Sequence, residues 1–231
     1  MVTHHAGVLV VHDTTGADGQ DLVSGAETFN FSNGNQVARA DFTQQVFIQP
    51  IQVSDTNGSN TATFFGDQQQ EFEIQRLIDE IYLQAGVDVE WLPTNTVNNS
   101  FINNGNGAGT RSSGDLATII ELGDSLGVGH PDPIVLDFYF VERVPAFPVS
   151  SNFSANGLAF VDSNGIAMFT GNNLPGLESG RAVVARVAAH EIGHNLGLSH
   201  VSDPANLMDN GTEINSAQSS TIRSSIFTKD V

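Results

Sequence analysis

The sequence predicts an α+β fold, and three features of its 231 residues lead to that prediction. Segments with the period of strands alternate with segments that have the period of helices. Residues 134–142 are almost continuously apolar, as in a central strand that is covered on both faces. A long helical segment from Ser179 stops at Gly197 and leaves only a short C-terminal part. A sheet with its helices is therefore expected before Gly197, and a small subdomain after it.

The N-terminal segment, residues 1–45, is rich in Gly, Asn, Asp, Ser and Thr and contains only short apolar pieces. We expect it to form an irregular extension. The pattern changes at Val46, where VFIQPIQV predicts a strand over residues 46–53.

A helix is predicted next, because Asp67 and Gln70 have the spacing of a capping box. Apolar residues then follow at helical spacing: Ile74, Leu77, Ile78, Ile81 and Ala85. Gly86 is expected to end this helix in a left-handed conformation.

The middle of the chain predicts further strands and one more helix. Residues 87–91 alternate between apolar and acidic side chains, which is typical of a half-buried strand that Pro93 ends. An Asn- and Gly-rich loop is expected over residues 95–114, and a helix over residues 115–126. GLAFV and GIAMF predict two short strands that a DSNG turn joins as a hairpin.

The helix from Ser179 is expected to bury one stripe, formed by Ala185, Ala189, Ile192 and Leu196. Its histidines then lie on a neighbouring face that can look into a cleft. A last, weakly amphipathic helix is expected over residues 216–227, through Ile222 and Ile226.

The composition excludes several classes of function. The net charge of −18, from 26 acidic and 8 basic residues, argues against a nucleic-acid partner. No apolar run approaches the length that is needed to insert into a membrane. Cysteine is absent, so any metal site must be built from His, Asp and Glu.

The segment HEIGHNLGLSH carries the chemistry. His190 and His194 are four residues apart, so both rings project from one side of a helix, and a turn at Gly197 can return His200 as a third ligand. Three imidazoles with an open fourth position are the arrangement of catalytic zinc. Glu191 stands beside the first histidine, where a general base would hold the attacking water.

This segment resembles the metzincin metallopeptidases, whose signature is HExxHxxGxxH followed by a methionine turn, here at Met208. The spacing and the surrounding HVSDPANLMD are most similar to the matrixin branch. The resemblance implies a twisted, mostly parallel sheet with an antiparallel edge strand. It also implies that Leu158, Ala159 and Phe160 form that edge and bind substrate as an added strand.

The resemblance further implies a catalytic domain over residues 46–231, with an upper subdomain 46–197 and a lower subdomain 198–231, and secretion from the cell. Several residues depart from the family pattern. Val201 follows the third histidine, no tyrosine follows Met208, and residues 209–212 differ from the matrixin wall of the S1′ pocket. Residues 143–157 contain no histidine, which argues against a second, structural zinc.

The expected activity is zinc-dependent endopeptidase hydrolysis of a polypeptide substrate, with a zinc-bound water that Glu191 activates. The alternative is a non-enzymatic, zinc-stabilised binding or adhesion module on the same fold. Residues 1–45 are alternatively a pro-segment, with an aspartate such as Asp13, Asp21 or Asp41 over the zinc. Calcium is a second candidate cofactor, held by carbonyl groups and by Asp162 or Asp203. His4, His5, His12 and His130 are expected to be loop or solvent-facing residues.

Overall fold

The computed structural model describes residues 42–103, 113–142, 157–170 and 177–231, and the backbone of short strands between residues 2 and 38. Its centre is a seven-stranded sheet with the order β10-β11-β9-β6-β12, in which β7 and β8 also pair with β6. Its strands are β6 (Gln44–Ser54), β7 (Val87–Trp91), β8 (Asn95–Asn98), β9 (Leu136–Val141), β10 (Gly157–Ala159), β11 (Ile166–Phe169) and β12 (Thr228–Asp230).

The sheet is mostly parallel, as the sequence predicts. β6 pairs in parallel with β7, β8 and β9, and β9 pairs in parallel with β11. β10 pairs antiparallel with β11 and is the last strand in the order, so the predicted antiparallel edge strand is confirmed. All six residues of β9 are buried, which confirms the central strand.

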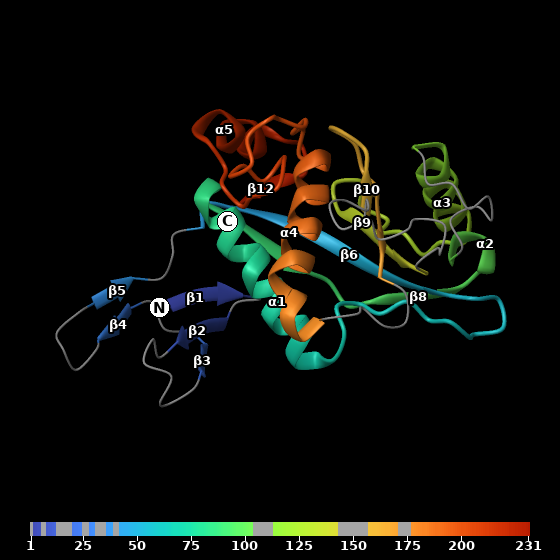
Figure 1. Ribbon diagram of the computed structural model, residues 1–231, viewed down its shortest axis with the longest axis horizontal. Helices are drawn as coiled ribbons and strands as arrows, with labels where there is room; N and C mark the ends of the chain where they lie inside the picture. The colour runs from blue at the N-terminus through green and yellow to red at the C-terminus, as the bar shows by residue number, and fades with distance from the viewer. Residues whose placement is uncertain are drawn as a thin grey trace.

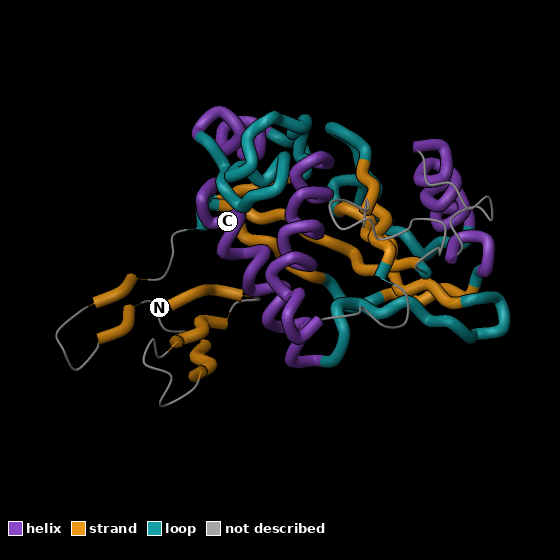
Figure 2. The backbone as a smooth tube through the Cα atoms, in the orientation of Figure 1, coloured by secondary structure: helices purple, strands orange, loops and turns teal. Residues whose placement is uncertain are grey.

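Helices cover both faces of this sheet (Figures 1 and 2). α1 (Gln68–Tyr82) and α4 (Leu177–Asn195) pack on one face, where Phe138 and Phe140 of β9 point. α2 (Ser100–Asn103) and α3 (Ser113–Ser125) pack on the other, with Tyr139 and Val141. This alternation follows from the two-residue period of a strand. α5 (Ser216–Ser224) lies in the C-terminal part.

The first helix has the predicted ends, with one addition. The side chain of Asp67 accepts a hydrogen bond from the backbone N–H of Gln70, and the Gln70 side chain accepts one from the backbone N–H of Asp67. The helix then tightens into a 3-10 turn, Leu83–Ala85, before Gly86 leaves it at φ +70°. Ile74, Ile78, Ile81 and Ala85 are buried, as expected.

Three other segments differ from the prediction. The expected loop 95–114 contains β8, which pairs with β6, and the short helix α2. Asp88, expected on an exposed face of its strand, is only 1% exposed, and Glu90 on the same face is partly buried. The last helix ends at Ser224, and β12 returns to pair antiparallel with β6. Phe227 is therefore buried and Ile226 is exposed.

The hairpin between β10 and β11 is confirmed, and its turn also contacts the central strand. Asp162 (φ 55°) and Gly165 (φ 121°) occupy left-handed conformations. The Asn164 amide accepts from the backbone N–H of Asp137 at 2.8 Å and donates to the Val135 carbonyl at 3.0 Å. The turn is thus tied to the start of β9.

The N-terminal segment is not irregular throughout, which corrects the prediction. β1 (Val2–His5), β2 (Val8–His12) and β3 (Gln20–Ser24) form an antiparallel sheet, and β4 (Thr28–Asn30) pairs with β5 (Gln36–Ala38). Alternation was too weak there to be recognised against the many polar residues. β1 lies against α1 and β7 (Figure 1). No helix in the described part of the chain has the length and apolar character that a membrane crossing needs.

Candidate metal centre

The C-terminal end of α4 is closed by a Schellman motif. The N–H of Leu198 donates to the Gly193 carbonyl at 2.9 Å, and the N–H of Gly197 donates to the His194 carbonyl at 2.9 Å. Gly197 has φ +94°, a conformation that costs glycine little. The chain therefore reverses within a few residues and returns His200 to the face that carries His194.

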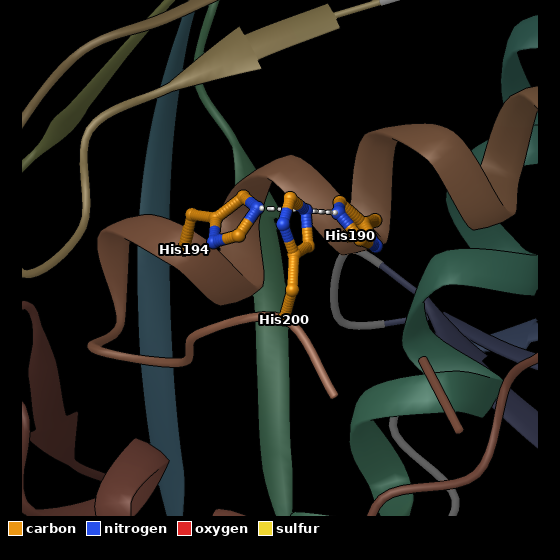
Figure 3. Close-up of side chains that lie close together, drawn as sticks. All are labelled: His190, His194 and His200. Carbon is orange, nitrogen blue, oxygen red and sulfur yellow. Dashed lines mark hydrogen bonds between the residues drawn. The ribbon is translucent and has the colours of Figure 1, made fainter. Parts of the chain in front are cut away.

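The structure brings the three predicted ligands together (Figure 3). His200 lies between the other two rings, and its Nε2 atom is 3.1 Å from the Nε2 atoms of both His190 and His194. One ring nitrogen from each residue lies within 4.8 Å of those of the other two. A tetrahedral zinc ion with Zn–N bonds of about 2.0–2.1 Å needs nitrogen atoms roughly 3.3 Å apart, so the triad is close to ligand geometry.

Two backbone carbonyls set the tautomers of the helix histidines. Nδ1 of His190 lies 2.7 Å from the Leu207 carbonyl, and Nδ1 of His194 lies 2.7 Å from the Leu198 carbonyl. A carbonyl can only accept, so each Nδ1 donates and each Nε2 carries a lone pair. His200 can donate to only one of these two Nε2 atoms. The centre thus has more lone pairs than hydrogens, and a cation is the group that satisfies it.

Burial keeps the helix histidines neutral, as metal ligands must be. Desolvation lowers the pKa of His194 to about 4, and it also lowers the pKa of His190. Both imidazoles are therefore uncharged at neutral pH. The donor set, its spacing and its protonation state all fit a zinc ion.

Met208 lies in the turn beneath α4 and is fully buried. A Cβ on Gly193 would come within 2.9 Å of the Met208 sulfur, so glycine is needed for this close approach. The backbone N–H of Met208 donates to the Asn206 side chain. The Asn206 side chain in turn exchanges two hydrogen bonds with the Gln218 side chain of α5. The turn that supplies the Leu207 carbonyl is thus anchored to the C-terminal helix.

Glu191 is only 8% exposed, and this burial raises the pKa of its carboxyl group to about 8. Gly157, the first residue of β10, lies directly against it. A Cβ at Gly157 would be 2.7 Å from Cγ and 2.8 Å from Oε1 of Glu191. The expected base and the start of the expected substrate strand are therefore in contact.

Leu158, Ala159 and Phe160 are all partly buried along the edge of the sheet. The side-chain amide of Asn195, the last residue of α4, donates to the Phe160 carbonyl at 2.8 Å and to the Gly165 carbonyl at 3.2 Å. The N–H of Asp162 donates to the His194 carbonyl at 2.9 Å. These bonds hold the edge hairpin against the end of the histidine helix.

The weaker predictions have mixed outcomes. Among the described residues, three or more potential metal ligands converge at the histidine triad. Neither Asp162 nor Asp203 belongs to it. Calcium binding therefore stays a prediction. His130 is a partly buried loop residue whose Nδ1 accepts from the Asp132 N–H. The side chains of the other three early histidines, and residues 143–156, lie outside the described part of the chain.

Sequence reasoning missed several residues of this site: Gly157, Asn195, Asn206 and Gln218. Asn215 and Gln218 form a capping box on α5, and their three-residue spacing is a signal that could have been read. Gly157 and Asn195 act across long sequence separations and carry no local signal.

A comparison with known protein families agrees with this geometry. A family model described as matrixin matches residues 29–225. The chain is similar to metalloproteinase-II from Bacteroides fragilis at 10% identity, over 93% of this chain and 74% of that one, with a TM-score of 0.45. It is also similar to a chain in a structure of a chaperone-substrate complex, at 12% identity over 84% and 36% of the two chains, with a TM-score of 0.40. Among curated proteins, no sequence matches.

Proposed function

This chain belongs to the matrixin family of zinc metallopeptidases, and from this premise we propose that it is an endopeptidase whose zinc is held by His190, His194 and His200. The observation that carries the proposal is the convergence of three Nε2 atoms. In His190 and His194 the Nδ1 atom donates its hydrogen to a backbone carbonyl, so the Nε2 atom carries a lone pair. When bound, zinc lowers the pKa of a water toward 7 and polarises the carbonyl of the scissile bond.

Glu191 is the proposed general base. It accepts a proton from the attacking water and later donates that proton to the nitrogen of the leaving amine. Burial by itself raises the pKa of Glu191 to about 8. A nearby cation would favour the carboxylate form before water attacks.

The substrate is proposed to bind as an extended segment along Leu158, Ala159 and Phe160. β10 is the terminal strand of the sheet, so its outer edge can pair with one more strand. Gly157 places the start of this edge against Glu191. A peptide that pairs with β10 would therefore run past the general base.

The division into an upper subdomain 46–197 and a lower subdomain 198–231 is part of this proposal, with the substrate between them. Secretion is proposed on family grounds. For residues 1–45, the contact of β1 with α1 and β7 supports a structural role over a pro-segment. Removal of these residues would raise peptidase activity if they were inhibitory. If they are structural, removal would leave the activity unchanged or lower it.

The test of the mechanism is Glu191→Ala. Peptidase activity should fall by about 10²–10⁴-fold or more, because one carboxylate serves both proton transfers. Zinc content, measured by elemental analysis, should stay near one per chain, because Glu191 is not a ligand. Glu121→Ala, on α3 at the other face of the sheet, is the matched control and should keep its activity.

The rival function is a zinc-stabilised binding module without enzymatic activity. This function would be assigned instead of endopeptidase activity if the zinc-loaded wild-type protein shows no chelator-sensitive cleavage of a peptide library or of an unfolded protein.

A further inference from the structure

The peptide unit between Leu207 and Met208 lies in the turn beneath α4 and is held on both of its sides. Its carbonyl accepts a hydrogen bond from Nδ1 of His190 at 2.7 Å. Its N–H donates to Oδ1 of Asn206 at 2.9 Å. A peptide unit is planar, so its carbonyl and its N–H can only turn together. The Asn206 side chain therefore sets the direction of the carbonyl that orients the first histidine.

The side chain of Asn206 is held in turn by Gln218 of α5. Nδ2 of Asn206 donates to Oε1 of Gln218 at 2.8 Å, and Nε2 of Gln218 donates to Oδ1 of Asn206 at 2.9 Å. A backbone N–H can only donate, so the atom that it contacts in each amide must be the oxygen. The N–H of Met208 identifies the oxygen of Asn206, and the N–H of Asn215 contacts the second oxygen at 3.1 Å. The two amides thus have one arrangement, which is anchored at the start of α5.

This amide pair is buried, since Asn206 is 3% exposed and Gln218 is 8% exposed. The next residues along the chain from Asn206, Leu207 and Met208, belong to the hydrophobic core. A buried polar group costs free energy unless its hydrogen bonds are made, and a satisfied buried network favours one geometry. Two apolar side chains could fill the same space without that requirement. What the amides supply, and apolar side chains cannot, is an acceptor that holds the Met208 N–H.

The same turn also reaches the third histidine. The Met208 carbonyl accepts from the N–H of Val201 at 3.2 Å, and this N–H belongs to the peptide unit that His200 begins. His194 differs, because its Nδ1 lies 2.7 Å from the Leu198 carbonyl at the end of α4. The turn therefore supports two of the three histidines, and the orientation of His194 does not depend on it.

We propose that Asn206 and Gln218 are positioning residues of the zinc site, which act through the Leu207–Met208 peptide to hold the His190 ring in the orientation that zinc needs. This inference rests on the proposed zinc-binding function. Removal of a residue that hydrogen-bonds to a metal ligand typically costs about 10–100-fold in metal affinity. The Leu207 carbonyl is such a partner of His190, and the amide pair acts one bond further out. We therefore expect a loss at the lower end of that range, about tenfold.

The first experiment measures zinc affinity by competition with a chromophoric chelator. Gln218→Met removes both bonds to Asn206 at a similar side-chain volume and should weaken zinc binding by about tenfold. Asn215→Ala is the matched control, because it removes the acceptor for the N–H of Gln218 and leaves the amide pair intact. Each change takes one half of the capping box from α5, so both should lower the urea midpoint. Asn215→Ala should nevertheless keep the zinc affinity of the wild type.

Gln218→Glu is the second variant, for the case in which Gln218→Met does not fold. Its carboxylate keeps the acceptor for the Asn215 N–H but cannot donate to Oδ1 of Asn206. It should weaken zinc binding in the same direction. An unchanged zinc affinity in a folded Gln218 variant, or an equal loss in Asn215→Ala, overturns the inference.

The second experiment uses the full chain without metal, so that the two proposals can fail separately. NMR on protein labelled at its histidine nitrogens follows the Nδ1–H signals of His190 and His194, which His190→Gln tells apart. In Gln218→Met the His190 signal should shift upfield and exchange faster with water, because its bond to the Leu207 carbonyl is loosened. The His194 signal should stay in place, because the Leu198 carbonyl holds it.

A His190 signal that stays as in the wild type, or a His194 signal that changes equally, overturns the inference. If the wild-type protein binds no zinc, the zinc-binding function fails instead, and the comparison of the two signals still decides whether the amide pair orients His190.

Discussion

The histidine turn, residues 190–208, and the edge hairpin, residues 157–170, meet at the end of α4 but are held there by different kinds of contact. In the histidine turn, the bonds that orient the rings join residues 4 and 17 positions apart in sequence. In the hairpin, the bonds from Asn195 span 35 and 30 positions. The metal side of the site is therefore built mainly by local structure, and the substrate side by tertiary packing.

This difference predicts that the two sides can be damaged independently. Local hydrogen bonds form with little loop-closure entropy, so the histidine geometry should survive changes in the hairpin. Long-range contacts depend on the packed fold. The position of the hairpin should therefore be sensitive to small substitutions at its interface with α4.

The largest effect is expected for His200→Ala, which breaks the metal side. Removal of a residue that only hydrogen-bonds to a metal ligand typically costs about 10–100-fold in metal affinity. Removal of a ligand itself should therefore cost at least about 100-fold. Zinc titration and elemental analysis should show a fall from about one zinc per chain to a small fraction. His130→Ala, outside the triad, should keep its zinc. Full zinc retention by His200→Ala would contradict the assigned ligand set.

Gly157→Ala should damage the substrate side and leave the metal in place. Its Cβ would lie 2.7 Å from Cγ of Glu191, so either β10 or the carboxylate must move. A displacement of about 1 Å near the reacting groups can cost on the order of 10²-fold in rate. Peptide cleavage should fall by about that factor, with unchanged zinc content.

Gly180→Ala is the control for this change, because a Cβ there meets no atom within 4 Å. It lies in α4, where alanine should stabilise the helix by roughly 0.5–1 kcal/mol. Equal activity of the two variants would show that Gly157 does not constrain Glu191.

A smaller effect is expected for Asn195→Ala, which loosens the hairpin. The change removes the two bonds to the Phe160 and Gly165 carbonyls. Loss of a buried hydrogen-bond partner costs about 1–3 kcal/mol in the free energy of unfolding. Urea unfolding should detect this loss, and zinc affinity should change little. Asn210→Ala, at an exposed position, should be neutral. A large loss of zinc affinity in Asn195→Ala would mean that the two sides are not independent.

Much of the fold was predictable because its signals are local. The Asp67 and Gln70 spacing predicted the start of α1, and the apolar run of β9 predicted the middle of the sheet. The strands between residues 2 and 38 and the strand β8 were missed, because polar residues hide their alternation. β12 was missed because its three residues, TKD, become a strand only through pairing with β6.

The same division applies to the site. The sequence by itself determined the histidine spacing, the acid beside the first histidine and the glycine that reverses the chain, since all three act within one helix and one turn. Only the tertiary structure decided how closely Gly157 approaches Glu191 and that the Asn195 side chain holds the edge hairpin through the Phe160 and Gly165 carbonyls. Such contacts join residues far apart in the chain, and their geometry exists only after the sheet and both of its helical layers have packed.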